Sequence, residues 1–232
     1  MPLIATDDRI RETALRLFAE KGFAATGIRE IAEQVGVMSA SLYHHIGSKE
    51  DLLFRIAIDA NRQLLRAARD AFCEVSRPEE RLVTLVRLHV AAHAHHQLEA
   101  LVVDNEMRAL SDAKRDEVVA VRDAYERMWQ DAIADGVRDG VFTVDDERAA
   151  RLALLEMCTG VAHWFSPSGE QTAEQIGAHF ADMALGLVRA RRGRYLRVDD
   201  VAQPTYERIQ ELLRRGPTSL ADGDPGPRAR VG

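Results

Sequence analysis

Residues 10–53 read IRETALRLFAEKGFAATGIREIAEQVGVMSASLYHHIGSKEDLL, and the helical spacing of their apolar residues decides the fold. One apolar stripe predicts a first helix over residues 8–21, which Gly22 ends. Thr26 is expected to cap a short second helix, and a third short helix is expected over residues 39–46. Two short helices that follow a supporting helix, with a tight turn between them, have the organisation of a helix-turn-helix, whose second helix enters the major groove of DNA.

The third helix of this stretch has one face that suits the major groove. Leu42 and Ile46 set its core side, so at about 100° per residue the side chains farthest from the core are those of Ala40, Ser41 and His44. A face of small polar residues without carboxylates lets a helix approach the groove floor. Ser41 is expected to hydrogen-bond a base edge, and His44 is expected to donate to a phosphate oxygen.

The flanks of the same helix carry Tyr43 and His45. Tyr43 is expected to donate to a phosphate, and His45 is expected to pack against the protein. The side chains of residues 43–45 fan around the helix, so they cannot together chelate one metal ion. Lys49 follows a capping pair at the start of the next helix, where its charge and the backbone N–H groups favour a phosphate.

The whole stretch is similar to the DNA-binding domain of the tetracycline-repressor (TetR) family of transcription regulators. The similarity rests on ALRLFAEKGFAATGIREIAEQVGV (residues 14–37) and SASLYHHIGSKEDLL (residues 39–53). One departure is Met38, where the family more often has Ser or Thr, and Ser39 is expected to take over the cap. The resemblance implies a homodimer that reads a palindromic operator in double-stranded DNA. The DNA contacts that it implies come from Thr26, Gly27, Arg29, Ser39, Ala40, Ser41, Tyr43, His44 and Lys49.

Composition and charge exclude several classes of protein. Hydrophobic residues make up 46% and charged residues 29% of the 232 residues, as in an ordinary globular protein. No stretch approaches the roughly 18 apolar residues of a membrane span, and acidic residues stand where a signal peptide needs basic ones, so a cytoplasmic protein is expected. The net charge of −6 predicts that DNA binding depends on individual positioned side chains and not on a positively charged surface. Cys73 and Cys158 lack metal-ligand spacing and are expected to be buried.

The remaining chain predicts an all-α protein in three parts. Helical periodicity dominates, and no run alternates as a strand does. The parts are a helix-turn-helix domain over residues 1–53, a ligand-binding and dimerisation domain over 54–195, and a largely disordered tail over 196–232, rich in Gly and Pro from residue 216. The longer helices of the second part are expected over residues 79–95, 112–138, 146–165 and 172–191. The last two have broad apolar faces with small residues, which favours a four-helix dimer interface.

A ligand pocket among the C-terminal helices is a further implication of the resemblance. A ligand that favours a conformer unfit for DNA weakens DNA binding, and DNA weakens ligand binding equally. The stretch VAHWFSPSGEQTAEQI (residues 161–176) and the LYHH form of the recognition helix resemble the branch of the family that responds to acyl-CoA thioesters. The pocket candidates are His89, His93, Met107, Tyr125, Met128, Trp129, Met157, His163, Trp164 and Phe165.

Two features leave alternatives open. His89, His93 and His96 fall at i, i+4 and i+7 on one helix face, a spacing that suits Zn²⁺, the lining of a pocket or a helix C-terminus. The basic run RARRGRYLR (residues 189–197) suits either phosphate binding or a solvated helix end. The competing classes are therefore an all-helical metal-dependent enzyme built on these histidines and a protein-interaction module. The interpretation that we keep is a ligand-responsive repressor that is not an enzyme and needs no metal or cofactor.

Overall fold

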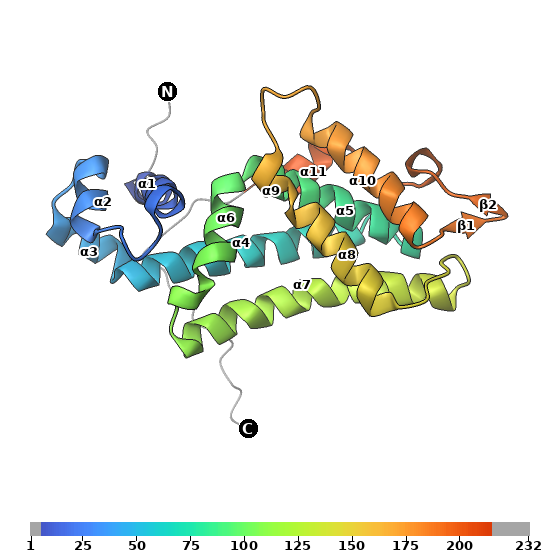
Figure 1. Ribbon diagram of the computed structural model, residues 1–232, viewed down its shortest axis with the longest axis horizontal. Coiled ribbons are helices and arrows are strands. Elements are labelled where there is room, and N and C mark those ends of the chain that lie inside the picture. Colours follow the sequence, from blue (N-terminus) through green and yellow to red (C-terminus); the bar gives the residue numbers. More distant parts are fainter. Residues whose placement is uncertain (1–5, 215–232) are drawn as a thin grey trace.

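The computed structural model describes residues 6–214, and helices account for most of them (Figure 1). Two short strands form the only sheet within this range. In chain order the elements are α1 (Thr6–Lys21), α2 (Ile28–Val35), α3 (Ser39–Ile46), α4 (Lys49–Phe72), α5 (Pro78–His95), α6 (Gln97–Glu106), the 3-10 turn η1 (Met107–Ala109), α7 (Asp112–Arg138), α8 (Glu147–Thr159), α9 (Val161–Trp164), α10 (Ala173–Leu187), β1 (Arg191–Arg192), β2 (Arg194–Tyr195), the 3-10 turn η2 (Val198–Asp200) and α11 (Tyr206–Leu212).

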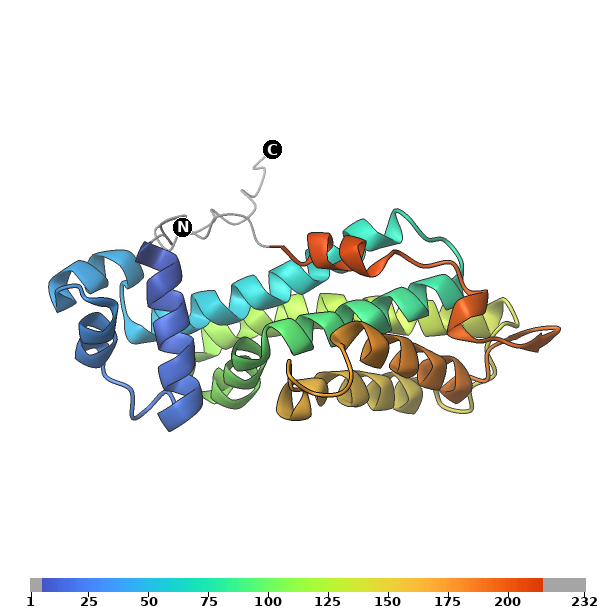
Figure 2. The ribbon, with the colours of Figure 1, turned by 90° about the horizontal axis from the view of Figure 1, so that it is seen from above.

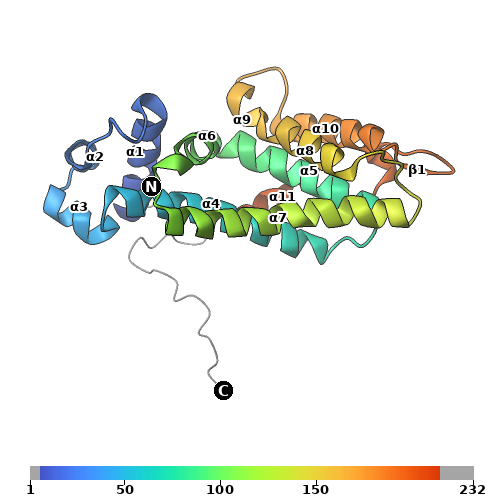
Figure 3. The same ribbon diagram turned by 60° about the horizontal axis from the view of Figure 1, so that its bottom comes forward.

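The molecule is elongated, with α1–α3 at one end and the β1–β2 hairpin at the other (Figure 1). The long helix α4 starts beside α3 and runs into the C-terminal helices, where α5 and α7 lie along it (Figure 3). Helices α8 and α10 cover one side of α5, and α11 lies on the opposite side, against α4 and α5 (Figure 2). The helix α4 thus runs from the N-terminal helices into the C-terminal bundle.

Local sequence explains where the N-terminal helices stop and start. Gly36 and Gly47 take left-handed φ angles of 78° and 74° at the ends of α2 and α3, a region that glycine enters without a steric penalty. Ser48 and Asp51 form the predicted capping box that begins α4. The predicted cap at Thr26 is wrong, because Gly27 is the N-cap of α2 and its side chain offers no acceptor.

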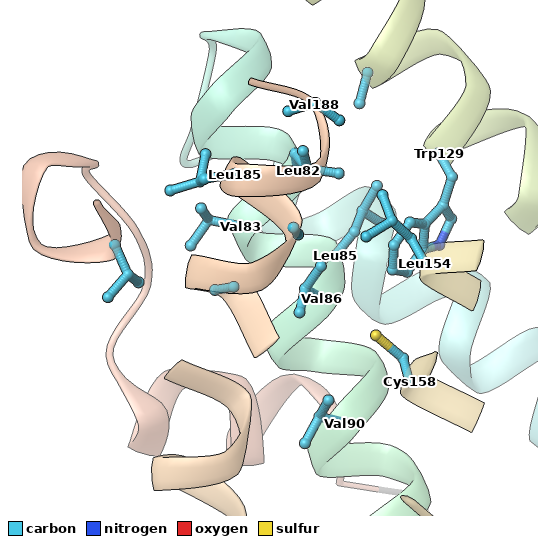
Figure 4. Packing of buried hydrophobic residues seen from close by; sticks show 14 of the residues in the cluster. Leu82, Val83, Leu85, Val86, Val90, Trp129, Leu154, Cys158, Leu185 and Val188 are labelled. Carbon is cyan, nitrogen blue, oxygen red and sulfur yellow. The ribbon is translucent and has the colours of Figure 1, made fainter. Parts of the chain in front are cut away.

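Two large apolar clusters hold the fold together. The N-terminal cluster packs the inner faces of α1–α4, and it continues into α6 and the start of α7 through Val102, Val103 and Val118. The C-terminal cluster surrounds α5, whose Leu82, Leu85 and Val86 meet α7, α8 and α10 (Figure 4). The consecutive residues 82–86 of α5 are all fully buried, so this turn is buried on every side, as expected of a helix at the centre of a bundle.

The C-terminal half departs from the sequence predictions in several places. The predicted helix over 146–165 is broken at Gly160 into α8 and α9. The predicted helix over 172–191 ends at Leu187, and the basic run that follows forms the hairpin, because the N–H of Arg191 donates to the carbonyl of Val141 at 2.9 Å and turns the chain away. Cys158 is buried as predicted, but Cys73 is exposed because it lies past the end of α4.

The predicted disordered tail begins too early. Residues 196–214 are folded, and α11 buries Ile209 and Leu212 against α4 and α5. A polar composition concealed a short amphipathic helix in this region. The Gly- and Pro-rich run over residues 216–232 lies outside the described residues. Within residues 6–214, no helix is both long and apolar enough to cross a bilayer.

Candidate DNA-binding surface and effector cavity

The recognition helix α3 presents the face that its sequence predicts. Leu42 and Ile46 are fully buried, whereas Ala40 and His44 are exposed and Ser41 is half-buried. The Tyr43 side chain is 51% exposed at the flank, so its hydroxyl is available to a phosphate. No carboxylate lies on α3. The helix can therefore enter a groove lined by phosphates without placing negative charge there.

The two adjacent histidines of α3 differ in their surroundings. The Nδ1 atom of His45 lies 2.7 Å from a carboxylate oxygen of Asp7 on α1, and the His45 side chain is 35% exposed. This contact joins α3 to the supporting helix, which suits the predicted structural role of His45. His44 is exposed and faces outward, where a DNA backbone would lie.

Two of the predicted DNA contacts hold the turn between α1 and α2. Thr26 is buried, and its hydroxyl donates to the carbonyls of Gly22 at 2.9 Å and Leu17 at 3.3 Å. The Lys49 ammonium group donates to the carbonyls of Phe23 at 2.7 Å and Thr26 at 2.8 Å. The side chains of Thr26 and Lys49 are thus directed at the turn, so a phosphate contact through Lys49 would require its bonds to be exchanged.

The other predicted contacts lie at the surface around these helices. Gly27 and Arg29 are exposed at the start of α2, and Ser39 is half-buried in the first turn of α3. Met38 is the N-cap of α3 and is 78% exposed, and its side chain makes no cap hydrogen bond. The expected cap at Ser39 is therefore not formed, since Ser39 already belongs to the helix.

A buried ion pair joins this DNA-binding end to the C-terminal helices. An Nη atom of Arg11 on α1 lies 3.2 Å from a carboxylate oxygen of Glu99 on α6, and both side chains are 6% exposed. Asp59 on α4 lies 3.6 Å from the same guanidinium group. Glu106 of α6 also accepts the N–H of Phe23 at 3.1 Å. Helix α6 is therefore bonded at two points to the domain that carries the recognition helix.

A cavity of about 420 Å³ lies among α4, α5, α6, α7 and α8. Five of the predicted pocket residues line it: His89, His93, Met107, Tyr125 and His163. The other five do not. Trp129 is fully buried in the core around α5, Trp164 is 53% exposed at the surface, and Met128, Met157 and Phe165 pack beside that core. The helical spacing of these residues could not distinguish a core face from a cavity face.

The inner wall of the cavity is a chain of neutral hydrogen-bonding groups. His89 contacts the Tyr125 hydroxyl at 3.1 Å through Nδ1 and the Thr159 hydroxyl at 3.0 Å through Nε2. His93 donates from Nδ1 to the carbonyl of His89 at 2.9 Å, and the two imidazole rings stack 4.0 Å apart. Burial lowers the pKa of both histidines, so both are neutral and Nε2 of His93 is an acceptor.

Several cavity residues were not predicted from the sequence. They are polar residues of helices, and nothing in their spacing separates them from residues of a solvated face. Glu126 is held on this wall by Arg122 at 3.4 Å and by Arg151 at 2.6 Å. The unpredicted polar residues that line the cavity are Asn61, Gln63, Glu99, Asp104, Arg122, Glu126, Glu156 and Thr159. His96 also lines it, which agrees with one of the interpretations left open for the histidine face.

The geometry of the histidine cluster does not suit a metal ion. Both ring nitrogens of His89 face hydroxyl groups, and one nitrogen of His93 faces a carbonyl. His96 is the C-cap of α5, where the helical spacing of the three histidines ends. Across residues 6–214, no group of three or more His, Cys, Asp or Glu side chains is placed to hold a metal. The cluster instead forms part of the cavity wall.

Two further surfaces bear on the sequence predictions. The outer face of α10 exposes two apolar side chains, with Met183 at 58% and Leu187 at 41%. Leu152 of α8 is 43% exposed and also lines the cavity. The arginines of the basic run 189–197 mostly pair with carboxylates, as Arg192 does with Glu79. These pairs fix the hairpin to the bundle, so the run is neither a free phosphate site nor a helix end.

Comparison with known proteins agrees with this arrangement of a helix-turn-helix and a cavity-bearing bundle. A family model described as bacterial regulatory proteins, tetR family, matches residues 10–56, and one described as tetracyclin repressor-like, C-terminal domain, matches residues 75–188. The HTH-type transcriptional repressor KstR2 of Mycolicibacterium smegmatis is 30% identical over 80% of this chain and 92% of its own length. The chain belongs to the TetR family of transcriptional regulators.

Solved structures of TetR regulators share its fold. The ketosteroid transcriptional regulator KstR2 of Mycobacterium tuberculosis has a TM-score of 0.75 at 27% identity, over 81% of this chain and 96% of its own. AibR, solved in complex with isovaleryl coenzyme A and operator DNA, has a TM-score of 0.70 at 27% identity, over 77% and 97%. The protein is therefore a TetR-family DNA-binding regulator with an N-terminal helix-turn-helix and a C-terminal helical domain, and it is not an enzyme.

Proposed function

We propose that this protein is a homodimeric repressor that leaves a palindromic operator when a small effector, an acyl-CoA thioester, fills the cavity. The observation that carries the proposal is the cavity itself, because its lining residue Glu99 is also the ion-pair partner of Arg11 in the DNA-binding end. An effector that displaces Glu99 would move α6 and, through Arg11, α1. Operator DNA and effector then favour different conformers, so each lowers the affinity for the other.

The effector class is supported by the walls of the cavity and by two relatives. A volume of about 420 Å³ is in the range of small-molecule sites, roughly 300–1,000 Å³, and suits an acyl group whose nucleotide portion stays at the mouth. Leu64, Val103 and Leu155 supply apolar wall, and Arg122, whose side chain is 53% exposed, supplies a cation at the cavity. AibR was solved with an acyl-CoA, and KstR2 is a repressor.

The homodimer is proposed to form through α8 and α10. Their exposed apolar side chains would be covered by the same surface of a second copy, which gives a two-fold interface. The two α3 helices of such a dimer would enter successive turns of the major groove, about 34–36 Å apart. On this proposal, residues 6–53 form the DNA-binding unit and the helices after them form the effector and dimer unit, and the regulator acts in the cytoplasm.

Operator release by acyl-CoA is tested by fluorescence anisotropy with labelled DNA from upstream of the gene. We expect the protein to bind this DNA and decanoyl-CoA to release it, with free coenzyme A and free decanoate as controls. DNA binding that no acyl-CoA from two to sixteen carbons reduces would refute the effector class. Loss of DNA binding on addition of free coenzyme A alone would also refute it, because the acyl group would then carry no recognition.

The interface is tested by sedimentation equilibrium with two charge-introducing variants. Met183→Glu places a carboxylate on the exposed face of α10, and we expect it to yield monomers. Val119→Glu makes the same change at a residue of α7 that is 39% exposed, and we expect it to remain dimeric. A dimeric Met183→Glu protein would contradict the proposed interface.

A further inference from the structure

The C-terminal helix α11 lies beyond residues 75–188, the region that matches the family's C-terminal model. It packs against α4 and α5 on the side opposite to α8 and α10 (Figure 2). At this contact α4 and α5 present mostly small side chains, and the C-terminal segment supplies three large ones. The buried residues of this contact are Ala67 and Ala71 of α4, Leu88 and Ala91 of α5, and Ile209, Leu212 and Leu213 of the C-terminal segment.

Polar contacts hold the start of the segment against α5 and the end of α4. Before α11, Arg87 of α5 donates to the side-chain oxygen of Gln203 at 2.6 Å and to the carbonyl of Pro204 at 3.0 Å. Along α11, Arg208 pairs with Glu74 at 2.8 Å. These contacts reach from the segment to α5 and to the residues just past α4. Docking is therefore specified by several independent bonds and by apolar burial.

The last residues of the segment reach the effector cavity. The side-chain amide of Gln63 on α4 donates to the carbonyl of Leu213, and both residues line the cavity. Leu212 is buried to a similar degree, with 8% exposure against 5% for Leu213, and it packs against α4 and α5 but does not line the cavity. Two adjacent leucines thus share one buried contact, and only Leu213 also lines the cavity.

We propose that the C-terminal segment is part of the effector site, with Leu213 as an apolar wall that contacts the hydrocarbon part of the ligand. The Gln63 amide fixes the backbone of Leu213, so the wall keeps its position while the cavity is filled. The assignment rests on the proposed function for the identity of the ligand. The new element is that Leu213, which lies outside the two regions that match the family models, contacts the ligand.

The two leucines provide a matched pair of variants in the full-length chain. Leu213→Ala and Leu212→Ala remove the same atoms from neighbouring buried positions, so both are expected to lower the thermal midpoint. Decanoyl-CoA binding, measured by isothermal titration calorimetry, is expected to weaken about tenfold in Leu213→Ala, as loss of apolar contact with one leucine implies, and less than about twofold in Leu212→Ala. Operator affinity without effector is expected to be the same in both variants.

Equal affinities of the two variants for decanoyl-CoA would overturn the assignment of Leu213 to the effector site. If the wild-type protein binds no acyl-CoA, the proposed effector class fails and the wall is tested with another probe. The fluorescent probe 1-anilinonaphthalene-8-sulfonate binds apolar cavities, and its dissociation constant is compared in the same two variants. A larger loss in Leu213→Ala supports the wall, and equal constants overturn it.

Discussion

The buried ion pair between Arg11 and Glu99 allows a quantitative prediction for Glu99→Gln. The substitution keeps the shape of the side chain and removes its charge. At 3.2 Å and an effective dielectric constant of about 20, the lost attraction is about 5 kcal/mol. A neutral amide also avoids the desolvation cost of a buried carboxylate, and Asp59 remains 3.6 Å from the guanidinium group. We therefore expect the free energy of unfolding to fall by about 3 kcal/mol.

The measurement is urea unfolding followed by circular dichroism, with two reference variants. Glu30→Gln breaks the exposed pair with Lys21 and should leave the unfolding curve unchanged. The double variant Arg11→Met, Glu99→Leu removes both charges and should be more stable than Glu99→Gln, because no unpaired charge is left buried. If Glu99→Gln unfolds at the wild-type urea concentration, the pair does not hold α1 against α6 and the proposed route from cavity to DNA fails.

Three further predictions follow from single side chains. His44→Ala should weaken operator binding in anisotropy titrations without shifting the thermal midpoint. His45→Ala should lower the free energy of unfolding by about 0.5 kcal/mol through loss of its contact with α1, and it should leave specific DNA contacts in place. Burial lowers the pKa of His89, so below about pH 6.5 the unfolded protein binds more protons at this residue than the folded protein does. In thermal unfolding, the stability should therefore fall as the pH drops further, by at most about 1.4 kcal/mol per pH unit for this group. Gly136→Ala would place a Cβ atom 2.0 Å from the buried Phe142 ring and should cost about 2–3 kcal/mol in chemical unfolding.

In the N-terminal domain, some features could be predicted from residues that are close together in the sequence, and others could not. The faces of α3 follow from helical geometry, because Leu42 and Ile46 can be buried together only if Ala40 and His44 point away. The capping box at the start of α4 could likewise be predicted, since its two residues lie three positions apart. The roles of Thr26 and Lys49 could not, because their partners are carbonyl groups of a turn whose path depends on how α1 packs against α4.

The sequence by itself determined the helical class, the helix-turn-helix and the residues of its outward face, since each depends on contacts within a few turns of helix. Only the tertiary structure decided which half of the predicted pocket residues faces the cavity, because a helix at the centre of a bundle is buried on every side. It also decided that Glu99 meets Arg11 and that Leu213 meets Gln63. Those pairs lie 88 and 150 residues apart in the chain, and no local spacing encodes contacts over such separations.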